Sequence, residues 1–145
     1  MTDIKYALRG ITITQFATVF EPATDDIGLN VEIPIKTNYK EHSVAIGANI
    51  RFTENGNAFL IMEVFCHYVI EQECWRELSA EDTNDVKLPK RLINNLVAIA
   101  ISTARGALCA KTENTPFSKF FLPVIMITPE KGEDLMIMKQ SANEE

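Results

Sequence analysis

The first half of the chain alternates apolar and polar residues with a period of two, the pattern of strands that turn one face toward a core. The alternation predicts four strands, at residues 4–20, 29–36, 44–52 and 59–72. Gly10 indicates a bulge or kink in the first strand. Pro34 has no backbone N–H for a central ladder, so the second strand lies at an edge or is locally broken. Asn55 and Gly56 predict a tight hairpin between the last two strands.

Alternation also assigns side chains to the faces of these strands. It places Ile11 and Ile13 on one face of the first strand, and Tyr6, Leu8 and Phe16 on the other. The last strand differs, because both of its faces are apolar. A strand of this kind is normally central, with a helix layer over one face and a second cover, such as a partner subunit, over the other.

The apolar period changes to 3.6 after the polar residues 79–87. Pro89 is well placed at the first position of a helix, and the apolar stripe that follows runs for about six turns. Residues 117–127 are extended and apolar, and residues 133–140 fit a short amphipathic helix. Strands first and helices after predict an α+β fold with helices on one face of a sheet.

Composition supports a single domain over residues 1–145, because 46% of the residues are hydrophobic, 23% are charged, and the length suits one core. The three cysteines are too widely spaced for a disulfide framework or a zinc pair, so we expect reduced thiols. The net charge of −6, without a basic run, argues against binding to nucleic acid.

Neither a signal peptide nor a membrane span is expected. Charged residues interrupt the start of the chain every few positions. The apolar stretch at 120–127 is far shorter than the roughly 20 residues that cross a bilayer. We therefore expect a cytoplasmic protein without stable membrane insertion.

The residues that commonly carry catalysis do not form a recognisable site. His42 and His67 lack metal-ligand spacing, and the sequence has no phosphate-binding loop or nucleophile elbow. His67 shares its predicted strand face with Glu63 and Glu71, so a proton-shuttling cluster is conceivable, but a solvated sheet surface is the favoured interpretation. Glu63 is expected to face solvent or a partner, because an unpaired buried carboxylate is costly. We expect no enzyme activity, no cofactor and no metal.

An apolar run in the second half is expected to pack mainly in the core. Part of it is a candidate lining for a groove that takes an apolar ligand or a peptide. The candidate groove residues are Phe117, Phe120, Phe121, Leu122 and Met126. A methionine suits such a groove because its thioether side chain adapts to irregular partners.

Short motifs also follow one another along the chain in a recognisable order. They are Phe20-Glu21 with Pro22, Phe59-Leu60, Glu63-Val64, Ala104-Arg105, Asn114-Thr115, Pro123-Val124 and Thr128-Pro129. Their order and spacing resemble those of the SecB family of export chaperones, which has Gly-Thr in place of Asn114-Thr115. The resemblance covers most of the chain.

The resemblance implies a four-stranded antiparallel sheet followed by a long helix and a short C-terminal helix. It implies a homotetramer, a dimer of dimers in which first strands pair across subunits and helices lie between the sheets. It further implies a holdase chaperone in protein export, which binds unfolded or precursor polypeptides along apolar grooves without ATP.

In the SecB family the motor protein SecA is bound through acidic residues on the exposed sheet face. Glu21 and Glu63 match that acidic pair, and Ile61 matches the apolar residue two positions before the second acid. Ile61 and Glu63 share a strand face by parity. Ala17 stands where the family has a further acidic residue.

The segment between the first two strands, residues 21–29, is shorter than the crossover of the family and lacks its tryptophan. Three hypotheses therefore stay open. The first is a generic holdase chaperone, and the second is a dedicated adaptor or antitoxin-type chaperone for one protein partner. The third is a small-ligand-binding or enzymatic α+β domain, which no residue pattern favours.

Overall fold

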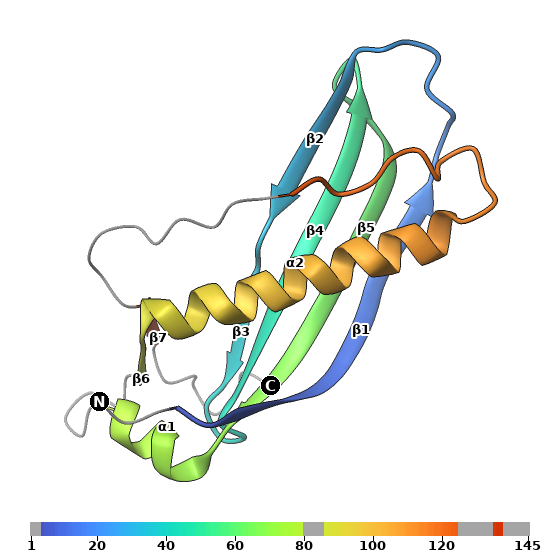
Figure 1. Ribbon diagram of the computed structural model, residues 1–145. Coiled ribbons are helices and arrows are strands. Elements are labelled where there is room, and N and C mark those ends of the chain that lie inside the picture. The colour runs from blue at the N-terminus through green and yellow to red at the C-terminus, as the bar shows by residue number, and fades with distance from the viewer. Residues whose placement is uncertain (1–3, 80–85, 125–134, 138–145) are drawn as a thin grey trace.

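A curved antiparallel sheet crossed by one long helix forms most of the structure, a computed structural model in which residues 4–79, 86–124 and 135–137 are described (Figure 1). The elements in chain order are β1 (Tyr6–Thr18), β2 (Ile27–Glu32), β3 (Ile35–Asn38), β4 (Ser43–Glu54), β5 (Asn57–Ile70), α1 (Gln72–Leu78), β6 (Val86–Leu88), α2 (Lys90–Thr112) and β7 (Leu135–Ile137). The α+β class, the antiparallel sheet and the long helix after it agree with the sequence prediction.

The strand order across the sheet is β1-β5-β4-β2, with β3 also paired to β4. β2 and β3 are two halves of the predicted second strand, and the break between them contains Pro34. The Pro34 carbonyl still accepts a hydrogen bond from the Gly47 N–H of β4 at 2.8 Å. The predicted second strand is therefore both broken at the proline and placed at an edge of the sheet.

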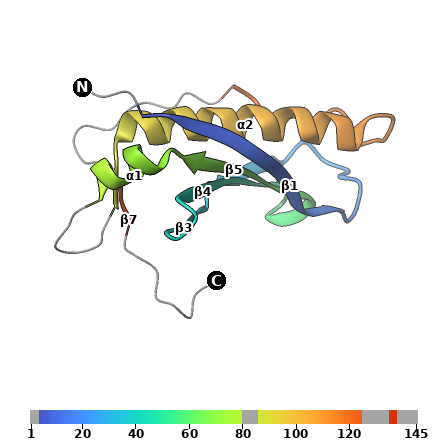
Figure 2. The same cartoon turned by 90° about the horizontal axis from the view of Figure 1, so that it is seen from below.

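β5 is the central strand that its two apolar faces predict, because it pairs with β1 on one side and with β4 on the other. The β4–β5 hairpin turns at Asn55 and Gly56, whose φ angles of 51° and 85° are the left-handed values of an Asn-Gly turn. α2 lies over one face of the sheet and packs against β4 and β5 (Figure 2). We call this the helix face, and the opposite one the far face.

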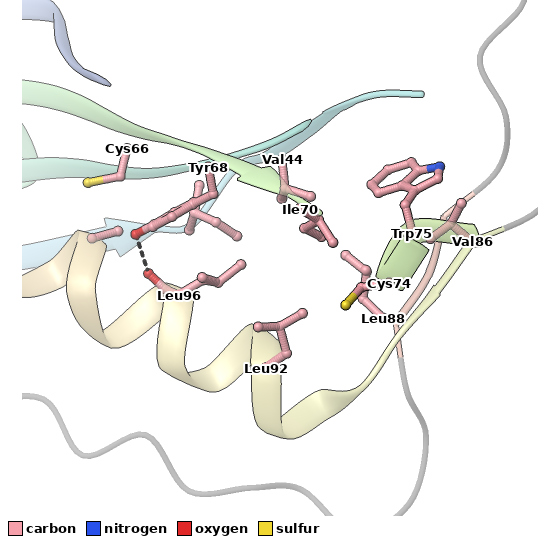
Figure 3. Packing of buried hydrophobic residues seen from close by; sticks show 12 residues of the cluster. Val44, Cys66, Tyr68, Ile70, Cys74, Trp75, Val86, Leu88, Leu92 and Leu96 are labelled. Atoms are coloured by element: carbon pink, nitrogen blue, oxygen red, sulfur yellow. Dashed lines mark hydrogen bonds between the residues drawn. The ribbon is translucent and has the colours of Figure 1, made fainter. Parts of the chain in front are cut away.

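α2 turns a stripe of buried apolar side chains toward the helix face. The members of this stripe are Leu92, Leu96, Ala100, Ile101, Ala104 and Leu108, each at most 5% exposed. Apart from the adjacent Ala100 and Ile101, successive members are three or four residues apart, which is the spacing of one side of a helix. The Tyr68 hydroxyl of β5 donates a hydrogen bond to the Leu96 carbonyl at 2.9 Å, which ties the helix to the sheet (Figure 3).

Among the described residues, one helix has the length and apolar composition to cross a membrane. This helix is α2, with a mean hydropathy of 1.4. A core helix passes the same test, and here the apolar stripe is packed on the sheet. The outward side of α2 carries small exposed side chains. They include Ala98, Ser102, Gly106, Cys109 and Ala110.

α1, β6 and the start of α2 enclose one end of the core with the sheet (Figure 3). Trp75 of α1 is 2% exposed. Its ring stacks on that of His42, with centroids 5.3 Å apart, and meets that of Tyr39 edge-on at 5.6 Å. Val86 and Leu88 of β6 are fully buried in the same cluster.

Two short elements differ from the prediction. The sequence predicts a short helix after the long one, but the structure has a short helix, α1, before α2. β5 ends at Ile70, and α1, seven residues long, then buries Cys74 and Trp75. Residues 135–137 form β7, a strand paired with β6, where the sequence predicts part of a helix. The rest of the predicted helix lies outside the described residues. A three-residue strand depends on a partner far away in the sequence, which local periodicity does not report.

Candidate interaction surfaces

β1 carries two β-bulges that decide which of its side chains face α2. Its pairing with β5 shifts register once around Arg9 and again around Thr14. Each bulge displaces the alternation by one position, so that apolar residues on either side of it come to share a face. The first bulge lies beside Gly10, where the sequence predicts one, but the strict alternation expected for this strand is wrong.

The bulges gather five apolar side chains on one face of β1. We call them the β1 row: Tyr6, Leu8, Ile11, Ile13 and Phe16, which pair with Ile70, Tyr68, Cys66, Val64 and Met62 of β5. Directly paired residues point to the same side of a sheet, and these β5 partners are buried in the core beneath α2, so the row belongs to the helix face. Phe16 is half-buried, and the other four side chains are 37–52% exposed.

β1 is also an edge strand, since in the described part of the chain it pairs with β5 alone. A long edge strand presents unpaired N–H and C=O groups, which proteins normally cover, shorten or interrupt with charge. The β1 row adds exposed apolar area to this edge. The β1 row is therefore an open apolar surface on the first strand, whereas the sequence led us to expect one on β5.

Residues 113–124 leave α2 and run back across the helix face toward β2 (Figure 1). Arg105 of α2 fixes this return segment: its guanidinium donates from Nε to the Leu122 carbonyl and from Nη2 to the Pro123 carbonyl, both at 2.8 Å. The forked donors of arginine suit two adjacent carbonyls. Arg105 thus explains what the Ala-Arg motif does in this chain.

Five phenylalanines pack where the return segment meets the β4–β5 hairpin. This aromatic cluster consists of Phe20, Phe52, Phe59, Phe117 and Phe120. Their contacting ring centroids lie between 4.9 and 6.4 Å apart, the range of favourable aromatic pairs. Phe59 is completely buried, whereas Phe20 is 37% exposed.

The structure places the candidate groove residues in different environments. Leu122 is completely buried, and Phe117 and Phe120 are half-buried in the aromatic cluster. Leu122 belongs to the core, and Phe117 and Phe120 pack against it, the role expected for most of the apolar run. Phe121 is open, with 64% of its surface exposed. Met126 lies outside the described residues.

Other exposed apolar side chains were not singled out from the sequence. Together with Phe121 they form what we call the apolar rim: Val19, Phe20, Leu29, Phe121 and Val124. They belong to β2, to the return segment and to residues 19–26, the crossover between β1 and β2. Periodicity could not find them, because it reports the side of a strand and not whether a tertiary neighbour covers it.

One carboxylate holds the crossover in place. Glu54 Oε2 accepts hydrogen bonds from the Thr24 hydroxyl, the Thr24 N–H and the Ala23 N–H at 2.8, 2.6 and 2.8 Å. These bonds, with that of the Thr24 side chain first, hold the pKa of Glu54 below its ordinary value. The Asn55 N–H also donates to the Asp26 carbonyl at 3.2 Å. These hydrogen bonds therefore hold the crossover against the end of the β4–β5 hairpin.

Glu63 lies at the centre of a polar network on the far face. Its Oε2 accepts a hydrogen bond from the Asn49 amide at 2.9 Å, and its Oε1 accepts one from the Thr14 hydroxyl at 2.7 Å. These bonds, that of Asn49 first, lower the pKa of Glu63, and the positive charges of Lys36 and Arg51 add to the effect. The carboxylate is half-buried and hydrogen-bonded, and not fully buried, where its position in the sequence predicts a carboxylate that faces solvent or a partner.

The other two residues that the resemblance implies for SecA docking lie in different elements: Ile61 in β5 and Glu21 in the crossover. Ile61 is half-buried on the far face of β5, as parity with Glu63 predicts, and Glu21 is exposed in the crossover. The same face buries Phe65, whose ring lies beneath the Lys36 ammonium at 4.7 Å from the centroid. For Phe65 the chain itself supplies the second cover that a two-sided apolar strand needs.

The far face holds no arrangement typical of catalysis within the described residues. His67 Nε2 lies 3.0 Å from the Thr12 hydroxyl, which binds the imidazole to the neighbouring strand. No three His, Cys, Asp or Glu residues in the described ranges are grouped so as to hold a metal ion. The three cysteines lie within the described residues and form no disulfide; Cys66 and Cys74 are buried, and Cys109 is exposed.

Comparison with known proteins finds likeness among solved structures. No family model matches the sequence, and no curated protein matches it. Among solved structures, the chain is similar to the SecB-like chaperone Rv1957 of Mycobacterium tuberculosis, solved in complex with a ChAD peptide from the Rv1956 HigA1 antitoxin. The match has a TM-score of 0.46 and 16% sequence identity, and it covers 83% of this chain and 90% of that chain.

Proposed function

We propose that this protein is an ATP-independent chaperone that binds non-native polypeptide segments through exposed apolar side chains. The observation that carries the proposal is the presence of two sets of exposed apolar side chains, the β1 row on the edge strand and the apolar rim on the crossover, β2 and the return segment. Large exposed apolar patches on a soluble protein mark sites of interaction with another chain. Apolar contact selects for side-chain type rather than for one sequence, which suits a binder of many clients.

We assign the β1 row to a second copy of the chain. Pairing of two β1 edges continues the sheet and sets the two rows side by side on one face, and a self-complementary contact of this kind gives a closed dimer. The small exposed side chains on the outward side of α2, among them Ala98, Gly106 and Ala110, let a second helix layer approach closely. A dimer of dimers with helices between the sheets is the assembly that these two surfaces support.

We assign the apolar rim to the client. Phe121 and Val124 are 64% and 85% exposed on a return segment whose carbonyls Arg105 holds, and Leu29 is 38% exposed on the edge strand β2. Side chains that are already fixed in place lose little conformational entropy when a client binds. Several such weak contacts along one extended chain add up to useful affinity.

Suppression of aggregation of a reduced, unfolded client protein tests this function. We expect the protein to slow aggregation at stoichiometric concentration, and Phe121→Ser to weaken the effect because it removes an exposed ring. Ser118→Ala changes an exposed neighbour in the same segment and serves as the matched control. A wild-type protein that protects none of several clients would overturn the proposal.

One observation favours a second function, that of a dedicated adaptor or antitoxin-type chaperone for one protein partner. The crossover is short and is fixed by three hydrogen bonds to Glu54, and a rigid wall suits one partner shape better than many. This function predicts tight binding of a single peptide and no protection of generic clients. The aggregation assay therefore separates the two functions.

We do not extend the proposal to SecA. Both oxygens of Glu63 already accept hydrogen bonds, from Thr14 and from Asn49, and Ala17 offers no further acid. A role in export and a cytoplasmic location stay predictions from the sequence.

A further inference from the structure

Some residues of β1 turn their backbone groups to β5, and others turn them to the open edge of the sheet. Residue pairs in an antiparallel ladder alternate between those that exchange both N–H···O bonds and those that exchange none. The Val19 N–H donates to the Phe59 carbonyl, and the Glu71 N–H donates to the Lys5 carbonyl, both at 2.8 Å. These bonds fix the alternation: β5 turns the backbone groups of its odd-numbered residues to β1 and those of its even-numbered residues to β4.

The β1 residues whose backbone faces the open edge are those paired with even-numbered residues of β5. They are Tyr6, Leu8, Ile11, Ile13, Phe16 and Thr18. This set is the β1 row extended by Thr18. The row therefore offers apolar side chains on the helix face and N–H and C=O groups along the edge at the same positions.

The two bulges give these edge-facing residues a spacing that is the same in both chain directions. Successive members are two, three, two, three and two positions apart, because each bulge adds one residue to the strand. The bulges lie at residues 9–10 and 14–15, and Thr12 is midway between them. A two-fold axis at Thr12 therefore exchanges one bulge with the other.

Antiparallel pairing of two β1 strands about Thr12 lets every edge-facing residue meet another. The opposed pairs are Tyr6 with Thr18, Leu8 with Phe16, and Ile11 with Ile13. The three-residue steps of one strand face those of the other, so the ladder continues past both bulges. A regular strand turns its backbone groups to one edge at every second residue, and it loses this match at each bulge. The edge therefore fits a second copy of β1 better than an extended client.

The side chains agree with this register. Directly opposed residues point to the same side of a sheet, so apolar side chains of the two rows meet on the helix face. Arg9 is the one charged residue of β1, and it lies opposite the uncharged Gln15 of the other copy. Pairing centred on the first bulge would instead bring the Arg9 side chains of the two copies together, and like charges across a ladder are destabilising.

We propose that the two bulges of β1 set the register in which a second copy of the chain pairs with this edge, antiparallel and with Thr12 on the two-fold axis. The inference rests on the proposed function, which assigns the β1 row to a second copy, and it adds the register and the basis for selecting that copy. Thr12 turns its backbone groups to β5, so the two Thr12 residues form a non-bonded pair on the far face. The Cα atoms of such a pair are about 4.5 Å apart.

A disulfide at the axis tests this register. Thr12→Cys is made in a Cys109→Ser background, because Cys109 is exposed and the other two cysteines are buried. We expect complete linkage into dimers on mild oxidation, because a disulfide spans Cα atoms at about this distance. Gln15→Cys in the same background is the matched control. It is exposed on the same face but lies opposite Arg9 of the other copy, so it should stay unlinked in non-reducing electrophoresis.

Paired charges test which members of the row meet. Ile11→Glu and Ile13→Lys should each be monomeric alone in sedimentation velocity, because an unpaired charge would lie in the contact. An equal mixture of the two should associate, because each dimer then opposes one glutamate to one lysine. A mixture of Ile11→Glu with Leu8→Lys is the control and should stay monomeric, since those positions meet only in a register centred on the first bulge.

The outcomes separate the register from the function on which it rests. Self-association of the natural chain without linkage of Thr12→Cys would overturn the register alone, and so would association of the Leu8→Lys mixture in place of the Ile13→Lys mixture. A natural chain that stays monomeric would refute the assembly and the register together. The aggregation assay reads the chaperone function independently of both.

Discussion

At the scale of single residues, Gly47 shows how closely the far face is packed. A Cβ built at this position would lie 2.8 Å from a ring carbon of Phe65 and 2.9 Å from Cγ of Pro34. The Phe65 ring thus occupies the space that a side chain at position 47 of β4 would need, and the ring is buried in that position. The requirement for glycine is one of space, since the φ angle of Gly47 is not in the left-handed region.

Gly47→Ala is expected to lower the free energy of unfolding by about 1–3 kcal/mol, because the ring and the proline must both move. Equilibrium urea unfolding measures the change. Gly106→Ala is the matched control, because an added Cβ there meets nothing within 4 Å on the outward side of α2. In a helix interior alanine is favoured over glycine by about 0.5–1 kcal/mol, so the control should be neutral or stabilising. Equal effects at both glycines would contradict the packing described.

Tyr68 makes the second residue-scale prediction. The pKa of the Tyr68 phenol is raised, and burial is the largest cause of this shift. The hydroxyl therefore stays protonated and donates to the Leu96 carbonyl. Tyr68→Phe should cost about 1 kcal/mol of unfolding free energy, the usual net value of one hydrogen bond. Tyr6→Phe, at an exposed ring of the β1 row, should leave stability unchanged. A larger loss for Tyr6→Phe than for Tyr68→Phe in the same urea titration would refute this role.

At the scale of elements, long periodic segments could be predicted and short ones could not. β4, β5 and α2 follow from alternation or helical period over many residues. Backbone chemistry marks two boundaries: Pro34 lies in the break between β2 and β3, and Asn55-Gly56 forms the turn between β4 and β5. α1 and β7 are too short for a period to appear, and β7 exists through pairing with β6. The second bulge of β1, between Ile13 and Gln15, escaped prediction because no glycine or proline marks it in the sequence.

The crossover gives a prediction about pH. Its hydrogen bonds favour the charged form of Glu54, so the folded-state pKa lies below the ordinary value of 4.5. The stabilisation is complete above the ordinary value and is lost as pH falls through the folded-state value. The Thr24 amide proton should therefore titrate with a midpoint below 4.5 in nuclear magnetic resonance spectra.

Substitution of Glu54 should remove this titration. In Glu54→Gln the Thr24 amide shift is expected to be independent of pH across the acid range. Glu77→Gln, an exposed carboxylate of α1, should leave the Thr24 titration as it is in the natural chain. A Thr24 midpoint at or above 4.5 in the natural chain would show that Glu54 does not hold the crossover.

At the scale of the whole molecule, the structure has more apolar surface than one chain covers. The candidate groove run could be predicted as mainly core, and Leu122, Phe117 and Phe120 are packed there. The exposed surfaces themselves could not be predicted, because exposure depends on where α2 and the return segment lie over the sheet. Ile11 is the most exposed member of the β1 row, at 52%, and nothing in the sequence indicates this exposure.

The β1 row is therefore expected to control assembly. Ile11→Asp should reduce the protein to monomers, because an unpaired charge would be buried in the contact between copies. Ala7→Asp is the control, since it puts the same charge on the far face of the same strand, where Ala7 pairs with Val69. Sedimentation velocity over a range of concentrations measures both variants. Identical behaviour of the two would mean that self-association does not use the helix face of β1.

The most direct test of the central claim, that the exposed apolar surfaces of this chain are there to bind other polypeptides, is one measurement of mass. The purified protein is passed through size-exclusion chromatography with light scattering, alone and after mixing with a reduced, unfolded polypeptide. We predict a homo-oligomer, a tetramer by the proposed assembly, whose mass increases by that of one client chain. A monomer whose mass is unchanged by the unfolded polypeptide would contradict both the self-association of β1 and the chaperone function.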